Sequence, residues 1–170
     1  RFATRFPLTR GIANKRARAL FDLCAGFVYS QILAACVELR VFEQLAQGPR
    51  EAAAIAAETQ LPVEAARRLL KAAVALELLR EWPGDRFGLA DLGAAVLANP
   101  GVAAMIAHHA LLYDDLRDPV ALLKRGAGER LPGFWAYATQ ERPEAYCDLM
   151  SQSQALVAED VLDAYSFPGR

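Results

Sequence analysis

The sequence predicts a mainly α-helical fold: a winged-helix module with a small β-hairpin wing, extended by additional helices. Hydrophobic residues make up 54% of the 170 residues, and many of them are alanine, which combines high helix propensity with little bulk. Within residues 34–89, three helical patterns precede one hairpin pattern, with loops of the lengths that such modules use.

The N-terminal residues are basic. The first twenty residues contain no acidic side chain. Their basic residues are Arg1, Arg5, Arg10, Lys15, Arg16 and Arg18. We expect residues 1–18 to form a flexible, solvated leader. An arm for a membrane surface or an anionic ligand, and an organelle presequence, stay open as alternatives.

Residues 17–47 predict one long helix, or two helices joined at Gly26. The middle of this segment, residues 23–37, carries no charge, and a helix that is apolar all round must be covered on every side. A second subunit or the protein's own core would provide that cover, and the residues alone leave both open. The uncharged stretch is shorter than the roughly 20 residues that a membrane span needs.

The rest of the winged-helix module follows this helix. Gly48-Pro49 ends the helix, residues 50–59 are a short alanine-rich helix, and Pro62 opens a third. One face of the third helix is apolar and consists of Ala66, Leu69, Leu70, Ala73 and Val74. Residues 80–82 and 86–89 flank a Pro-Gly-Asp turn, which predicts the hairpin wing.

Further helices are expected after the wing, over residues 91–98, 102–113, 118–126 and 143–165. Between the last two lies a short aromatic segment, residues 134–138. The aromatic and methionine side chains near this end of the chain either line a large apolar pocket or pack the helices together.

A winged helix suggests DNA binding, with Arg67, Arg68 and Lys71 as the phosphate contacts. The same helix also carries Glu64 and Glu77, and the chain has a net charge of −1. Because a phosphate-binding face is normally more one-sided, we expect no nucleic-acid partner. A winged-helix regulator is kept as an alternative of another class, as is a dimeric binding module for an apolar ligand.

Neither a metal site nor a catalytic motif is predicted. His108 and His109 point about 100° apart on a helix, so they do not ligate one metal from a single face. A histidine facing a pocket and a core histidine both stay open. The cysteines, Cys24, Cys36 and Cys147, form no CxxC pair, which favours buried thiols in a reducing compartment. No glycine-rich nucleotide motif, P-loop or nucleophile elbow occurs.

The order of these parts resembles the S-adenosylmethionine-dependent O-methyltransferases of the plant caffeate type. VELRVFEQLAQGPREAAAIAAETQLP (37–62) is similar to the Leu-Phe…Leu…Gly-Pro…Ala-Ala run of that family. DRFGLADLGAAVL (85–97) is similar to its wing and following helix, with Phe87 and Ala90 in place of the usual Tyr and Thr. AYCDLMSQSQ (145–154) is similar to a family helix that reads Phe…Ala-Met, and AYSFPGR (164–170) to the linker before the cofactor-binding strand.

Within that family, three segments resemble the bacterial methyltransferases that act on acyclic carotenoids. They are FDLCAGFVYSQILAACVELRVFE (21–43), GVAAMIAHHALLYDDLRDPVALLK (101–124) and FWAYA (134–138). This resemblance implies methylation of a carotenoid C-1 hydroxyl by the whole enzyme. A domain like that of the bacteriochlorophyllide C-20 methyltransferases is the close alternative.

The resemblance also implies a domain plan. Residues 19–98 would be a long dimerisation helix plus the winged helix, residues 99–165 a helical segment that covers the substrate, and residues 166–170 the start of a linker. In the family, a following Rossmann-like domain binds S-adenosylmethionine and holds the catalytic base, generally a histidine. We therefore expect no catalytic or cofactor-binding residue in this chain, and no activity from it alone.

Two sets of site residues follow from the resemblance and from apolar character. The expected interface of a homodimer consists of Phe27, Ile32, Leu33, Cys36 and Val37. The expected cover of an apolar carotenoid substrate consists of Phe27, Tyr29, Met105, His109, Tyr113, Trp135, Tyr146 and Met150. Only Met150 falls on a family motif position, where Leu149 replaces the usual alanine. We expect a cytoplasmic protein whose basic leader makes weak contact with the membrane surface.

Overall fold

The computed structural model describes residues 7–125 and some isolated helical positions after them, namely Cys147, Ser151, Gln154, Ala158, Val161, Leu162 and Ala164. The described residues are mainly helical with one small sheet, as the sequence predicts. The aromatic segment 134–138 lies outside the described residues, and the helix expected at 143–165 is described only at those isolated positions.

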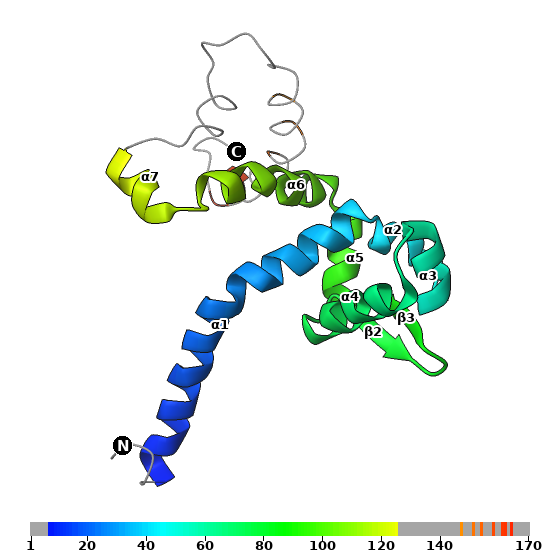
Figure 1. Cartoon of the computed structure of the whole chain (residues 1–170), viewed down its shortest axis with the longest axis horizontal. Coiled ribbons are helices and arrows are strands. Elements are labelled where there is room, and N and C mark those ends of the chain that lie inside the picture. Colours follow the sequence, from blue (N-terminus) through cyan, green and yellow to red (C-terminus); the bar gives the residue numbers. More distant parts are fainter. Residues whose placement is uncertain are drawn as a thin grey trace, which may run out of the picture.

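A single long helix, α1 (Pro7–Glu38), opens the described chain and projects away from the rest of the molecule (Figure 1). Its start at Pro7 differs from the expected flexible leader, since residues 7–18 are helical. No further proline occurs before Pro49, and a glycine inside a helix costs only about 1 kcal/mol relative to alanine. Gly26 therefore does not break the helix.

The break comes instead at Arg40, whose backbone is left-handed with φ 53°. Helix α2 (Val41–Gln44) follows at once, and the Gln44 side-chain amide donates to the Leu39 carbonyl oxygen at 3.1 Å. The change of direction at Arg40 turns the apolar Val41 and Phe42 into the core, where both are buried.

The sheet has three antiparallel strands in the order β1-β3-β2: β1 (Arg50–Glu51), β2 (Leu79–Trp82) and β3 (Arg86–Leu89). The hairpin is confirmed, with Leu79 opposite Leu89 and Trp82 opposite Arg86. The third strand was missed, because β1 takes the first two residues of the helix expected at 50–59. The Arg86 guanidinium donates to the Pro49 carbonyl oxygen at 2.9 Å, which holds β1 beside β3.

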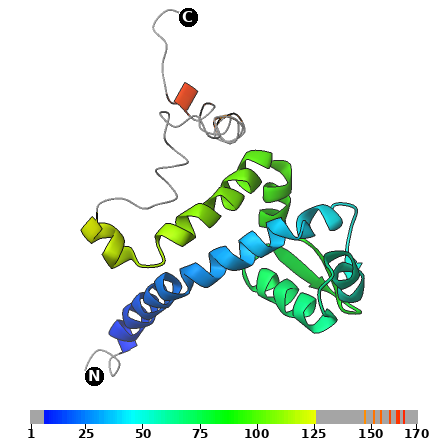
Figure 2. The ribbon, with the colours of Figure 1, turned by 45° about the horizontal axis from the view of Figure 1, so that its top comes forward.

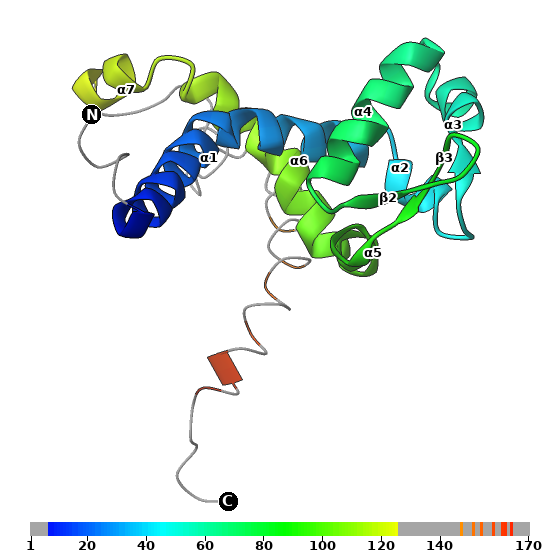
Figure 3. The same cartoon turned by 90° about the horizontal axis from the view of Figure 1, so that it is seen from below.

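Helices α3 (Ala52–Thr59) and α4 (Val63–Ala75) lie beside this sheet (Figure 3). The wing turn is fastened to α4 by an ion pair. Arg67 Nε donates to Asp85 Oδ1 at 3.1 Å, and Nη2 donates to Oδ2 at 2.8 Å. This bidentate contact holds Asp85 in a left-handed conformation, φ 55°, next to Gly84 at φ 79°.

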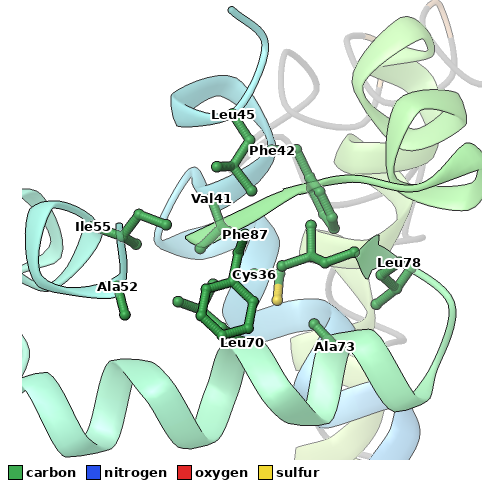
Figure 4. Packing of buried hydrophobic residues seen from close by; sticks show 11 residues of the cluster. Cys36, Val41, Phe42, Leu45, Ala52, Ile55, Leu70, Ala73, Leu78 and Phe87 are labelled. Carbon is green, nitrogen blue, oxygen red and sulfur yellow. The ribbon is translucent and has the colours of Figure 1, made fainter. Parts of the chain in front are cut away.

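The core lies where α1, α2, α3, α4 and the hairpin meet. Figure 4 shows its side chains converging from all of these elements, with Phe42 and Phe87 among the largest that are fully buried. The cluster consists of Cys36, Val41, Phe42, Leu45, Ala52, Ile55, Leu70, Ala73, Leu78, Leu79 and Phe87. Of the predicted apolar face of α4, Ala66, Leu70 and Ala73 are buried, and Leu69 and Val74 pack on the cluster.

In residues 90–125, three more helices follow the wing: α5 (Asp91–Ala98), α6 (Pro100–Asp115) and α7 (Pro119–Arg125). α5 approaches the core very closely, since a Cβ added at Gly93 would come within 2.2 Å of the Leu78 carbonyl oxygen. α6 then runs back along α1 and contacts it (Figure 2). The seam between α1 and α6 therefore lies outside the winged-helix core.

Candidate functional site

The most unusual surface of the described chain is on α1. Along its first two thirds large apolar side chains face solvent, with Leu23 80% and Phe27 65% exposed, and the set also includes Ile12, Leu20, Phe21 and Val28. Isolated exposed apolar residues are normal in soluble proteins, but six large ones along one helix indicate a contact surface.

The five residues expected at a dimer interface divide into two groups. Phe27 is exposed and available to a second chain, whereas Ile32, Leu33 and Val37 are half-buried against the winged-helix core. Cys36 has no exposed surface at all, and its burial raises the pKa of the thiol to about 12. The prediction of Cys36 as an interface residue is therefore wrong, because the last turns of an all-round apolar helix are already covered by the chain's own core.

The seam between α1 and α6 brings together two residues expected to cover a substrate. The rings of Phe27 and Tyr113 meet edge to face, with centroids 6.2 Å apart and planes at 89°. Tyr29 is half-buried nearby on α1, and its hydroxyl lies 3.5 Å from Asp22 Oδ1. On α6, Met105 is 41% exposed and His109 is half-buried. The other three expected residues, Trp135, Tyr146 and Met150, lie outside the described residues.

His108, beside His109 on α6, is half-buried. Partial burial, followed by the neighbouring His109, lowers the pKa of His108 below its usual range. A lowered pKa favours the neutral imidazole, which both donates and accepts hydrogen bonds. His109 was the histidine expected at the substrate, and no local pattern in the sequence indicates His108.

Two of the three basic side chains that DNA binding would use are paired with acidic side chains inside the winged-helix module. Arg67 binds both Asp85 and Glu64, and the Lys71 ammonium lies 4.0 Å from a Glu81 carboxylate oxygen. Pairing of this kind removes positive potential from the face that a phosphate backbone would meet.

The described residues do not fit S-adenosylmethionine. Rossmann-like folds hold such a cofactor at a glycine-rich turn between a strand and a helix. In residues 7–125 the glycines with positive φ are Gly84, between two antiparallel strands, and Gly48, between a helix and a strand. The same part of the chain contains no group of three metal-ligating side chains.

Comparison with known proteins identifies the module. The family model described as an O-methyltransferase dimerisation domain matches residues 21–99. Residues 21–99 are thus an O-methyltransferase dimerisation domain. The match begins inside α1 and ends after α5, so it contains the exposed Leu23 and Phe27 as well as the core.

Curated relatives of this O-methyltransferase domain share the sequence well beyond it. The chain is 47% identical to the demethylspheroidene O-methyltransferase of Cereibacter sphaeroides, over 94% of the chain and 44% of that protein. It is 41% identical to the protein of the same name from Rhodobacter capsulatus, over 93% of the chain and 42% of that protein. The chain thus spans less than half the length of these relatives.

A solved structure has the same fold. Human N-acetylserotonin methyltransferase, crystallised with S-adenosylmethionine, is 26% identical to the chain, with a TM-score of 0.70. The match covers 89% of the chain and 49% of that protein. The resemblance to the plant-type O-methyltransferases that the sequence motifs indicate is therefore confirmed.

Proposed function

We propose that this chain is the dimerising and substrate-covering part of an S-adenosylmethionine-dependent enzyme that methylates the C-1 hydroxyl of acyclic carotenoids. The observation that carries the dimer is the exposed apolar surface of α1, inside a domain whose family is described as a dimerisation domain. A second copy of the chain would cover the part of this surface that lies inside the domain, from Phe21 to Val28, and form a homodimer.

The substrate assignment has separate support. Two relatives that align over more than nine tenths of the chain are demethylspheroidene O-methyltransferases. Phe27 and Tyr113, joined edge to face, together with Met105, offer the apolar contact that a long polyene chain requires. These residues orient the substrate and exclude water, and they supply no proton or nucleophile.

The relatives also contain a part that does not align with this chain. We assign cofactor binding and catalysis to the corresponding part of the enzyme. Because the described residues offer no glycine-rich cradle, this chain alone should show no methyl transfer. Turnover by the purified 170-residue chain would contradict that assignment directly.

The substrate is tested with the natural polypeptide that contains this chain. It is incubated with methyl-labelled S-adenosylmethionine and an acyclic carotenoid with a C-1 hydroxyl, and the product is examined by mass spectrometry. The matched control is the carotenoid that lacks this hydroxyl. Bacteriochlorophyllide is tested in parallel as the substrate of the alternative enzyme. Label in the first carotenoid alone supports the proposal. Label in bacteriochlorophyllide and in neither carotenoid would replace the proposal with the bacteriochlorophyllide methyltransferase alternative.

A further inference from the structure

The first part of α1 lies ahead of the part that matches the dimerisation domain. Residues 11–20, here called the N-terminal arm, come before residue 21, where that match begins. Figures 1 and 2 show this part of the helix pointing away from the winged-helix core. At about 1.5 Å per residue, the arm is about 15 Å long.

The arm combines exposed apolar and basic side chains. Ile12 and Leu20 are 59% and 63% exposed, and their spacing places them within one side of the helix. Lys15 lies at the border of that side and Arg18 lies opposite it, while Arg16 falls among the apolar residues, where its long stem allows the charge to reach outward. The three basic side chains are exposed.

The charge of this segment has one sign. The first acidic residue of the whole chain is Asp22, which follows six basic residues. A second copy of the arm would bring like charges together, which is unfavourable at an interface between two identical segments. A surface of anionic lipid offers both opposite charge and an apolar layer for Ile12 and Leu20.

A membrane span is a less suitable place for the same helix. By length and composition, Gly11–Glu38 is long and apolar enough to cross a bilayer. However, Lys15, Arg16 and Arg18 would enter the hydrocarbon at one end, at a high cost. At the other end Cys36 is fully buried in the winged-helix core. This end cannot enter lipid without unpacking the core.

We propose that the N-terminal arm, residues 11–20 of α1, lies along the surface of an anionic lipid bilayer. The arm would hold the domain beside the phase in which an apolar substrate dissolves. This inference does not depend on the dimer or on the substrate proposed above, because it rests on the exposed side chains and charge of the arm alone.

The test is co-sedimentation of the 170-residue chain with vesicles of phosphatidylcholine alone or mixed with phosphatidylglycerol. The charge variant replaces Lys15, Arg16 and Arg18 with Gln. The matched control makes the same change at Arg68, Arg117 and Lys124, exposed basic residues of other elements, so both variants have the same net charge. An apolar variant carries Ile12→Gln and Leu20→Gln.

We expect the wild-type chain to bind the anionic vesicles, and added salt to weaken that binding. Since each basic residue near an anionic surface is worth a factor of about five in binding, the charge variant should bind at least about tenfold more weakly than the control variant. The apolar variant should also bind more weakly. Equal binding to both kinds of vesicle, or equal binding by the charge and control variants, would overturn the proposal.

The oligomeric state of every variant is measured by analytical ultracentrifugation in the same buffers. Loss of vesicle binding with an unchanged oligomeric state supports a lipid-facing arm. A charge variant that changes the oligomeric state and keeps its vesicle binding would show that the arm belongs to a protein interface. A monomeric wild-type chain would count against the proposed dimer, while the vesicle comparison would still decide this inference.

Discussion

Phe27 and Phe87 show how differently two regions of this chain use the same side chain. Phe87, on the middle strand of the sheet, has no exposed surface and lies among core residues from α1, α2 and α4. Phe27, on α1, is 65% exposed and its ring meets that of Tyr113 edge to face. The winged-helix core is complete within one chain, whereas the exposed part of α1 is not.

The same contrast occurs within a single helix. Cys36 and Phe27 are nine residues apart on α1, and one is fully buried while the other faces solvent. Helix composition therefore does not tell which apolar residues stabilise the monomer. Whether an apolar residue of α1 is buried depends on which other helices or strands of the chain pack against that turn of the helix.

The largest expected effect separates the two phenylalanines. Phe87→Ala should lower the free energy of unfolding by about 3–5 kcal/mol, since it removes a fully buried ring and leaves a cavity. Phe27→Ala should lower it by much less in the monomer, because most of that ring is already in solvent. Urea unfolding at low protein concentration measures both. Equal losses would show that the exposed part of α1 stabilises the monomer.

A second effect concerns the close packing of α5. Gly93→Ala should destabilise the chain by about 1–3 kcal/mol, since the new Cβ would overlap the Leu78 carbonyl oxygen. The matched control is Gly11→Ala on α1, where nothing lies within 4 Å of the new Cβ and the change should be neutral or stabilising. Thermal unfolding of both variants decides the comparison, and an unaffected Gly93→Ala would mean that α5 is free to shift.

Cysteine reactivity extends the comparison to chemistry. Burial raises the pKa of Cys36 to about 12, so its thiolate, the reactive form, is almost absent at neutral pH. Cys24, twelve residues earlier on α1, is exposed. A thiol reagent should modify Cys24 in the native chain and Cys36 only on unfolding, as mapped by peptide mass spectrometry. Reaction of Cys36 at the rate of Cys24 would contradict the packing of the core.

The smallest effect belongs to the ion pair of the wing. Hydrogen bonds from Arg67 lower the pKa of Asp85 below its usual range. The stability this gives is fully present above the ordinary aspartate pKa of about 3.9 and is lost as pH falls through the lowered pKa. Asp85→Asn should therefore flatten the acid side of the profile of melting temperature against pH by a small amount, because the pair is partly exposed. An unchanged profile would mean that the pair contributes nothing.

Much of the winged-helix module was predictable because its signals are local. Pro62 opens α4, the Pro-Gly-Asp turn sets the hairpin, and the spacing of Ala66, Leu70 and Ala73 marks the buried face. Strand β1 was not predictable, since two residues become a strand only through pairing with β3. The break at Arg40 was also missed, because a left-handed arginine has no local sequence signal.

The candidate site was predicted less completely than the fold. The apolar stretch of α1 was recognised from its lack of charge. Phe27, which was expected at the dimer interface, is exposed, and its place at an interface stays a prediction. Cys36 was misassigned because periodicity does not distinguish two sides of a helix that is apolar all round. The pairing of Phe27 with Tyr113 joins residues far apart in the sequence and depends on how α6 returns along α1.

The central claim, that a second copy covers the exposed part of α1, is tested most directly by sedimentation equilibrium of the 170-residue chain with Leu23→Asp. Substitution at Ile32 or Leu33 is a poorer test, since both pack on the core. The control is Leu123→Asp on α7, because Leu123 is 83% exposed and Leu23 is 80% exposed. We predict a dimer for the wild type and the control, and a folded monomer for Leu23→Asp. A wild-type monomer, or a dimer unaffected by Leu23→Asp, would contradict the account.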